Sequence, residues 1–333
     1  IKANASKHKA LSYRYACELE AQLQEEVAAL LKQAEQADNR ECADDYSIPE
    51  ELKRRQDRLA IIATAKAEIE RRAEARYQQE RAEYEEKMAR REARKQVGKA
   101  PKAPESGPRD KDQVNLTDEE SRIMPTSGGG FEQAYNAQAS VDNDSGLIIT
   151  RHVTQATNDK QEIKPTLAAL AELEPVAGKA EGLVADAGYF SEANVNAVDQ
   201  AGLQPYIAMR RDAHNQSLKD RFAPDAPRPE GEDVTPLVLM SWCLQTKAGR
   251  AIYSRRKCTI EPTFGIQKAV MGYRQFLVRG HEGVTAEWDL LCLAFNLKRM
   301  FSLMRGSSEK WFALRALIRS TRTLIAAILR NRR

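Results

Sequence analysis

Apolar residues recur every three or four positions in two stretches of the first hundred residues, a spacing that predicts two amphipathic helices. We expect them to pair as a hairpin over residues 12–96, with the second apolar face fading beyond Tyr77. Packing of these faces should supply most of the stability, because charge pairs one helical turn apart contribute little. A coiled-coil arm for oligomerisation is the alternative. The apolar positions are Leu19, Leu23, Val27, Leu30 and Ala34, then Leu52, Leu59, Ile62, Ile69 and Ala73.

The hydrophobic period changes to two after a region rich in glycine and proline. Residues 97–130 contain prolines and two glycine-rich breaks, and we interpret them as a linker. Alternation over residues 135–141 predicts a strand with one buried face, and residues 147–153 predict the returning strand of a hairpin. The polar residues between them, 142–146, are typical of a turn.

Helices and apolar strands then alternate. The pattern predicts a helix over residues 161–174, a covered strand at 183–185, a helix that begins after Ser191 and ends at Gly202, and a strand at 205–209. A hairpin followed by helix, strand, helix and strand indicates an α/β domain with a mixed sheet.

The predicted organisation has five parts. An α/β core spans residues 131–211, after the hairpin within residues 1–96 and the linker. Residues 212–248, which contain several prolines, are interpreted as an irregular insertion. Residues 249–333 are predicted to form the final helices, beginning near Tyr253.

Two isolated carboxylates attract attention as candidate chemistry. Asp186 follows the apolar strand at 183–185, at the strand end where α/β sheets bind ligands. Glu261 lies on a predicted amphipathic helix, close behind Arg255, Arg256 and Lys257. Carboxylates can hold Mg²⁺ and cations can hold phosphates, so this pattern fits metal-dependent phosphoryl transfer on a polyanion. The competing interpretations are a turn aspartate and a solvated helix surface.

The overall composition bears on three properties of the protein: its partner, its cysteine chemistry and its relation to membranes. The 333 residues carry a net charge of +4, and ten cations against one glutamate lie from Lys298 to the C-terminus, which suggests an anionic partner or simply a solvated terminal helix. Five scattered cysteines without paired spacing argue against a zinc site or a disulfide framework and fit a reducing, cytosolic setting. The apolar run at 324–329 is too short to span a bilayer.

Four segments together resemble bacterial insertion-sequence transposases of the DDE type. Residues 1–9 resemble the segment after the first catalytic strand in a subgroup with a long helical insertion. Residues 135–142 resemble the second strand, and residues 184–189 resemble the strand that bears the second catalytic aspartate. The signature around the catalytic glutamate is matched by Tyr253, Arg256, Glu261 and Lys268.

This resemblance implies an RNase H-like mixed sheet flanked by helices, with the N-terminal helical hairpin as an insertion. It also implies DNA cleavage and strand transfer at the ends of an insertion sequence, with two Mg²⁺ (or Mn²⁺) about 4 Å apart held by three carboxylates. Asp186 and Glu261 would be catalytic metal ligands, while Tyr253, Arg256 and Lys268 would steady the DNA backbone. The implied partners are double-stranded transposon ends and target DNA. The resemblance allows a homodimer on DNA. It implies a protein of the bacterial cytoplasm that is associated with the nucleoid when bound to DNA. We expect no membrane partner.

The chain departs from the family pattern in two ways. Four residues rather than three separate Arg256 from Glu261, so either Arg256 points differently or Lys257 takes its role. The strand with the first catalytic aspartate would precede Ile1, so we expect an N-terminally truncated chain that cleaves poorly. Asp142 is a fallback for that carboxylate, although its place in a turn argues against it. A non-catalytic DNA-binding or oligomerising remnant of a transposase is the alternative function.

Overall fold

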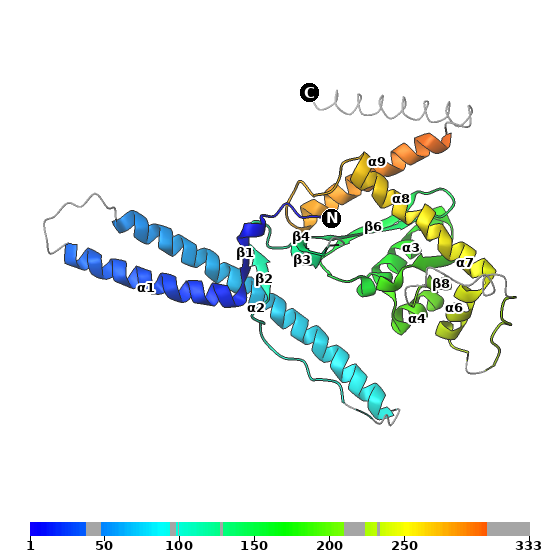
Figure 1. Ribbon diagram of the computed structural model, residues 1–333, viewed down its shortest axis with the longest axis horizontal. Helices are drawn as coiled ribbons and strands as arrows, with labels where there is room; N and C mark the ends of the chain where they lie inside the picture. The colour runs from blue at the N-terminus through cyan, green and yellow to red at the C-terminus, as the bar shows by residue number, and fades with distance from the viewer. Residues whose placement is uncertain are drawn as a thin grey trace. The chain divides into compact units, whose positions relative to one another are not determined.

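The chain forms two compact units. The computed structural model describes residues 1–37, 48–93, 98, 100–126, 129–209, 224–231 and 234–304. Residues 3–134 make one unit, called here the helical unit, and residues 1–2 with the described residues from 135 onward make the other, called the α/β unit (Figure 1).

The helical unit is built on two long helices joined to short strands. A 3₁₀ turn, η1, precedes the first strand, and each of the two strand pairs is antiparallel. The elements are η1 (Lys7–Lys9), β1 (Ala10–Ser12), α1 (Tyr13–Ala37), α2 (Ile48–Ala93), β2 (Gln113–Asn115), β3 (Arg122–Pro125) and β4 (Phe131–Ala134).

The core of the helical unit lies where the two predicted apolar faces meet. Leu23 of α1 is buried, as are Ile62 and Ile69 of α2, and all three belong to one cluster. Figure 1 shows α1 and α2 side by side. Two ion pairs between the helices flank the cluster: Arg55 lies 2.8 Å from Glu26 and Lys66 lies 2.5 Å from Glu20. The predicted helices are therefore present and pack within the chain, as the apolar spacing requires.

Part of the predicted linker is structured, which corrects its interpretation as a flexible joint. Strand β2 pairs with β1, placing Val114 opposite Leu11, and both side chains are buried in the core of the hairpin. Just before β2, both carboxylate oxygens of Asp112 accept hydrogen bonds from Arg76 at 2.9 Å. The prolines and charges around Val114 predicted a loop. The burial of Val114 against the hairpin follows from tertiary packing, which the local sequence pattern does not record.

The α/β unit follows the predicted order of hairpin, helix, strand, helix and strand. Its elements up to residue 207 are β5 (Asn136–Val141), β6 (Ile148–Thr154), η2 (Asp159–Gln161), α3 (Ile163–Ala177), β7 (Gly182–Ala185), η3 (Ala187–Tyr189), α4 (Glu192–Gln200) and β8 (Gln204–Ile207). The remaining elements are α6 (Pro236–Gln245), α7 (Lys247–Ser254), η4 (Arg255–Cys258), α8 (Ile260–Gly265), η5 (Ile266–Val270) and α9 (His281–Met304).

The strands of the α/β unit form two separate pairs among the described residues. β5 and β6 are antiparallel, as expected for a hairpin, whereas β7 and β8 are parallel. The mixed α/β class is thus present. The single RNase H-like sheet remains a prediction, because the described backbone hydrogen bonds pair β5 with β6 and β7 with β8 but join neither pair to the other.

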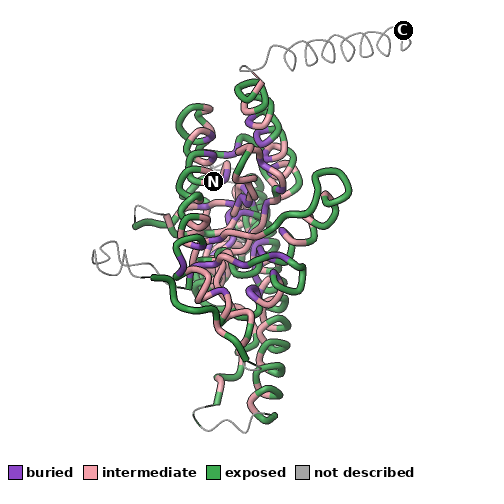
Figure 2. The backbone as a smooth tube through the Cα atoms, turned by 90° about the vertical axis from the view of Figure 1, so that its right-hand side faces the viewer, coloured by how far each residue is buried: buried purple, intermediate pink, exposed green. Residues whose placement is uncertain are grey.

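Two apolar groupings hold this unit together. Ile163, Val195 and Ile207 belong to a buried cluster between α3, α4 and β8. On the hairpin side, the fully buried Trp288 of α9 donates from Nε1 to the backbone oxygen of Gln138 at 3.0 Å. Figure 2 shows buried residues concentrated where elements pack and exposed residues along the outer turns of the helices.

The segment 212–248, predicted to be irregular, contains helix α6. Its first residue, Pro236, lacks an amide hydrogen and therefore suits the first turn, where that hydrogen would have no partner. Thr235 caps the helix by accepting a hydrogen bond from the amide of Val238, and Met240 is fully buried in the core. The proline that suggested a break instead marks a helix start. Residues 210–223 and 232–233 lie outside the described residues.

Two further expectations concern the C-terminal part. The last helices begin at α7, several residues before the predicted start near Tyr253. Of the basic C-terminal end, Lys298 and Arg299 lie in α9, and residues 305–333 lie outside the described residues. Among the described helices, none combines the length and apolar character needed to span a membrane.

The corner between α6 and α7 yields a stability test. A Cβ at Gly249 would lie 1.9 Å from the backbone oxygen of Cys243, whereas a Cβ at Gly265 in α8 would meet nothing within 4 Å. Gly249→Ala should therefore lower the free energy of unfolding by about 1–3 kcal/mol through overpacking. Gly265→Ala should raise it by roughly 0.5–1 kcal/mol, because alanine is the better helix former. Urea unfolding monitored by circular dichroism measures both, and equal effects would contradict the predicted clash.

Candidate active site

Asp186 stands at the C-terminal end of β7, where the chain turns into η3. Its Oδ1 accepts a hydrogen bond from the amide of Gly188 at 2.8 Å, so it caps this 3₁₀ turn. The other oxygen, Oδ2, faces Arg256. The turn-cap interpretation and the functional one are therefore compatible, since a single hydrogen bond from Gly188 leaves acceptor capacity on the carboxylate of Asp186.

The segment that carries Glu261 is not one continuous amphipathic helix, contrary to the sequence-based expectation. Helix α7 gives way to the 3₁₀ turn η4, then to α8, and then to the π-helical turn η5. Thr259, at the junction between η4 and α8, has φ −116° and ψ −79°, outside regular helical geometry. Each change of helix type rotates the following side chains relative to the preceding ones.

Arg256 lies between the two candidate carboxylates. Its Nη1 is 3.8 Å from Asp186 Oδ2 and its Nη2 is 3.3 Å from Glu261 Oε1. The side chain of Arg256 is 23% exposed, against 48% for Asp186 and 52% for Glu261, so the cation is the most enclosed of the three. The guanidinium carbon also lies 5.7 Å from the ring centroid of Tyr253, within the range of a cation–π contact. The guanidinium of Arg256 in η4 thus links the residue that follows β7 to residues of α7 and α8.

The break in the helix answers the question raised by the additional residue before Glu261. In a continuous α-helix, residues five apart point about 140° away from each other, so Arg256 would turn away from Glu261. The 3₁₀ turn and the irregular Thr259 restore their contact. Arg256 therefore faces both carboxylates, and Lys257 is exposed on the surface.

The neighbouring Arg255 fixes this segment to the β5–β6 turn. Its Nη2 donates to the backbone oxygen of Asn143 at 2.7 Å and lies 2.6 Å from Asp144 Oδ1. Successive arginines thus reach different places, Arg255 to the hairpin turn and Arg256 to the carboxylates. The basic cluster consequently serves partly as a structural clamp.

Lys268 lies on η5, where the π-helical turn replaces the regular spacing expected from the sequence. Its Nζ is 5.7 Å from the ring centroid of Phe264, and the side chain is exposed. Phe264 in turn stacks on Trp288 at a centroid distance of 6.0 Å. The aromatic pair joins this segment to α9, which leaves the lysine at the surface of the unit.

Asp142 is bonded within its own turn, as the turn interpretation predicted. Its Oδ2 accepts hydrogen bonds from the amide and the hydroxyl of Ser145, at 2.7 and 2.6 Å. Burial raises the pKa of the Asp142 carboxyl, but hydrogen bonds from Ser145 and from the Asp144 backbone, together with the charge of Arg255, outweigh this effect and hold the pKa below its usual value. A local turn role accounts for this geometry, and the fallback role as a third metal ligand stays a prediction without support from these contacts.

Sequence reasoning missed a polar network beside Asp186. Oδ1 of Asp159 accepts hydrogen bonds from Asn136 Nδ2 and Gln138 Nε2, both at 2.7 Å. Tyr189 donates its hydroxyl hydrogen to Oε1 of Gln138, which is buried. The available signal was the alternation along β5: Asn136 and Gln138, on the face opposite the predicted buried one, contact Asp159 instead of solvent.

Charge and burial keep the tyrosine of this network protonated. Burial raises the pKa of the Tyr189 hydroxyl far above its usual value, and the negative charges of Asp159 and Asp186 raise it further. A tyrosine hydroxyl is already protonated at physiological pH, and these effects widen the pH range over which Tyr189 donates a hydrogen bond.

The donor set fits a hard divalent cation with few protein ligands. Mg²⁺ is commonly bound through one or two carboxylates together with waters and substrate phosphates. Asp186 and Glu261 supply two such groups on different elements. Within the described part of the chain, no group of three or more His, Cys, Asp or Glu side chains could hold a metal ion. The oxygen-only pair suits Mg²⁺ or Mn²⁺ rather than zinc.

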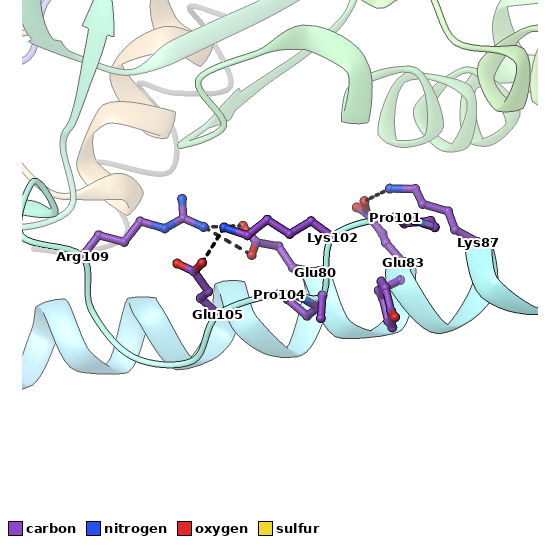
Figure 3. Close-up of a pocket in the computed structure, with 10 residues that line it drawn as sticks. Glu80, Glu83, Lys87, Pro101, Lys102, Pro104, Glu105 and Arg109 are labelled. Atoms are coloured by element: carbon purple, nitrogen blue, oxygen red, sulfur yellow. Dashed lines mark hydrogen bonds and ion pairs between the residues drawn. The ribbon is translucent and has the colours of Figure 1, made fainter. Parts of the chain in front are cut away.

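A hollow in the helical unit has a different character. It is open to solvent, has a volume of about 560 Å³ and lies between α2 and residues 101–109. Figure 3 shows its charged side chains pairing with one another, with Lys87 on Glu83 and Arg109 on Glu80. Such mutually neutralised charges leave no net attraction for an ionic ligand, and the hollow is best explained as packing of this segment along the helix.

Comparison with known families places the chain. A family model described as "Transposase DDE domain" matches residues 99–297, more than half of the chain and a region that includes Asp186, Arg256 and Glu261. Searches of curated proteins and of solved structures found no match. The resemblance seen in the sequence is therefore confirmed at the level of the family. The chain belongs to the transposase DDE domain family.

Proposed function

We propose that this chain catalyses Mg²⁺- or Mn²⁺-dependent cleavage and strand transfer of DNA at the ends of an insertion sequence. The observation that carries the proposal is the placement of Arg256 between Asp186 and Glu261. Residues 75 positions apart in the sequence meet around one cation, on elements that the family model spans. Metal-dependent reaction at a phosphodiester uses carboxylates to hold the metal ion and a cationic side chain to bind the phosphate.

The chain's own residues divide the work. Asp186 and Glu261 would hold the divalent ion, which supplies Lewis-acid stabilisation and an activated nucleophile. Arg256 would neutralise charge on the phosphate through its fork of donors, and its stacking on Tyr253 limits the conformations it must lose on binding. Lys257 and Lys268, both exposed, would contact the DNA backbone outside the reacting phosphate.

Double-stranded DNA, as transposon end and as target, is the partner this proposal requires. A homodimer on DNA belongs to the same proposal, since two ends must be joined. The second candidate is a non-catalytic DNA-binding remnant, which is favoured by one observation: among the described residues, no group of three or more acids, histidines or cysteines could hold a metal ion. Dependence of DNA binding on the metal separates the two candidates.

The first test is metal-linked DNA affinity. Mg²⁺ should tighten binding of the wild-type chain to a short fluorescent duplex, because the ion bridges carboxylates and phosphate. Glu261→Gln should abolish this gain and bind DNA at least as tightly as wild type in EDTA, since a negative charge is removed. Fluorescence anisotropy measures both affinities.

A matched control is Glu282→Gln, which alters an exposed glutamate likewise in the first turn of a helix, α9. It should keep the Mg²⁺ effect. Binding of wild type that ignores Mg²⁺, or a Mg²⁺ effect that survives both Asp186→Asn and Glu261→Gln, would favour the non-catalytic remnant.

The second test separates Arg256 from Lys257. Arg256→Ala should weaken DNA binding in Mg²⁺ about tenfold and lower the slope of log affinity against log salt by about one. Arg256→Lys should restore little, because an ammonium cannot reproduce the planar fork that reaches two groups. Lys257→Ala should have a smaller effect. A larger loss for Lys257→Ala than for Arg256→Ala would transfer the role to Lys257.

The third test concerns cleavage itself. We expect slow Mg²⁺-dependent nicking of duplex that carries the element's ends, because the family mechanism uses three carboxylates and the described residues contain no group of three ligands that could hold a metal ion. Denaturing electrophoresis of end-labelled DNA would detect it. Rapid nicking that depends on Glu261 would refute the expected weakness while supporting the function, and nicking unaffected by Asp186→Asn would refute the function.

A further inference from the structure

Asp159 is held rigidly by one of its two carboxylate oxygens. It begins η2, and Oδ1 accepts hydrogen bonds from Asn136 Nδ2 and Gln138 Nε2 at 2.7 Å. The two amides are themselves joined, because Gln138 Nε2 also lies 2.9 Å from Asn136 Oδ1. Two neutral donors on one oxygen orient the carboxylate without neutralising it.

The other oxygen of Asp159 faces Asp186 across a glycine. A Cβ at Gly188 would lie 3.0 Å from Asp186 Oδ1 and 3.3 Å from Asp159 Oδ2. The missing side chain at Gly188 therefore lets two carboxylates approach the same point. Among the described residues, the side-chain hydrogen bonds of Asp159 all end at Oδ1, so Oδ2 remains available on this side.

A buried amide fixes the two turns that carry these acids. Asn194 of α4 is 5% exposed, and its Nδ2 donates to the backbone oxygens of Lys160 at 2.8 Å and Tyr189 at 2.7 Å. Lys160 belongs to η2 and Tyr189 to η3, so the side chain of Asn194 joins the two turns by hydrogen bonds. The carboxylates thus face each other in a preorganised arrangement rather than through flexible loops.

Two like charges that face each other cost free energy unless a cation lies near them. Arg256 contacts Asp186 on Oδ2, the oxygen other than the one that approaches Gly188. The space beside Gly188 therefore gathers negative charge from two acids. A hydrated divalent cation would gain most from it, since its waters are strong donors and Mg²⁺ keeps several of them.

We propose that Asp159 is a positioning residue of the metal site, accepting through Oδ2 a hydrogen bond from a water of the divalent ion held by Asp186. The inference rests on the proposed function, because it assumes that Asp186 holds a metal. Asp159 acts through water and not as a direct ligand, in agreement with the absence of a three-acid cluster among the described residues. Outer groups of this kind orient the ligands and raise metal affinity.

The test measures Mn²⁺ binding to the full chain by the electron paramagnetic resonance signal of free Mn²⁺. Asp159→Asn keeps an acceptor for Asn136 and Gln138 but removes the charge, so Mn²⁺ affinity should fall about tenfold. The unfolding midpoint without metal should stay equal or rise, because repulsion with Asp186 is relieved. Asp199→Asn, an exposed aspartate on α4, is the matched control and should change neither quantity.

A second variant reaches the same space from the backbone. Gly188→Ala places a methyl group against both carboxylates and should also weaken Mn²⁺ binding, whether or not Asp159→Asn folds. Unchanged Mn²⁺ affinity in both variants, with Asp186→Asn still weakening it, would overturn this inference and leave the proposed metal site intact. Unchanged affinity in Asp186→Asn and Glu261→Gln as well would overturn the metal site itself.

Discussion

The guanidinium of Arg256 is the interaction on which the rest of the site depends. It is more enclosed than either carboxylate it contacts, and it stacks on Tyr253. Without a cation at this point, Asp186 and Glu261 would bring like charges together with no compensation. The fold of the α/β unit therefore places an arginine between the two acids, and its positive charge offsets their mutual repulsion. The neighbouring Arg255 clamps the same turn onto the β5–β6 hairpin, which gives Arg256 a fixed starting point.

A second constraint is the changing type of helix along residues 247–270. A uniform helix would have satisfied more backbone hydrogen bonds in regular geometry, yet it would have directed Arg256 away from Glu261. The 3₁₀ turn, the irregular Thr259 and the π-helical turn together set the directions of the side chains. Interruptions of this kind are frequent at functional sites, because they redirect a side chain without moving the helix that carries it.

The polar face of β5 shows how support for a site can look like an ordinary surface. Asn136 and Gln138 alternate with apolar residues, a pattern that usually places amides in water. Here they orient Asp159, while Tyr189 and Asn194 complete the network from η3 and α4. Neutral donors on β5 thus fix the carboxylate of Asp159, and Asn194 of α4 holds the turn that carries Asp159 against the turn that follows Asp186.

The sequence alone determined the helical hairpin, the strand and helix order of the α/β unit, and the two acids worth testing, because these follow from local periodicity and from residue type. It misjudged Pro236 as a break, Val114 as part of a linker and residues 253–268 as one helix, and it did not find Asp159. It predicted one mixed sheet, which stays a prediction, because the described strands pair β5 with β6 and β7 with β8 without joining the two pairs. Each of these depends on which distant groups meet, and only tertiary packing decides that. The contact of Arg256 with Asp186 and Glu261 is the clearest case. It depends on the change of helix type before Glu261 and on the packing of that segment beside the end of β7, and local periodicity records neither.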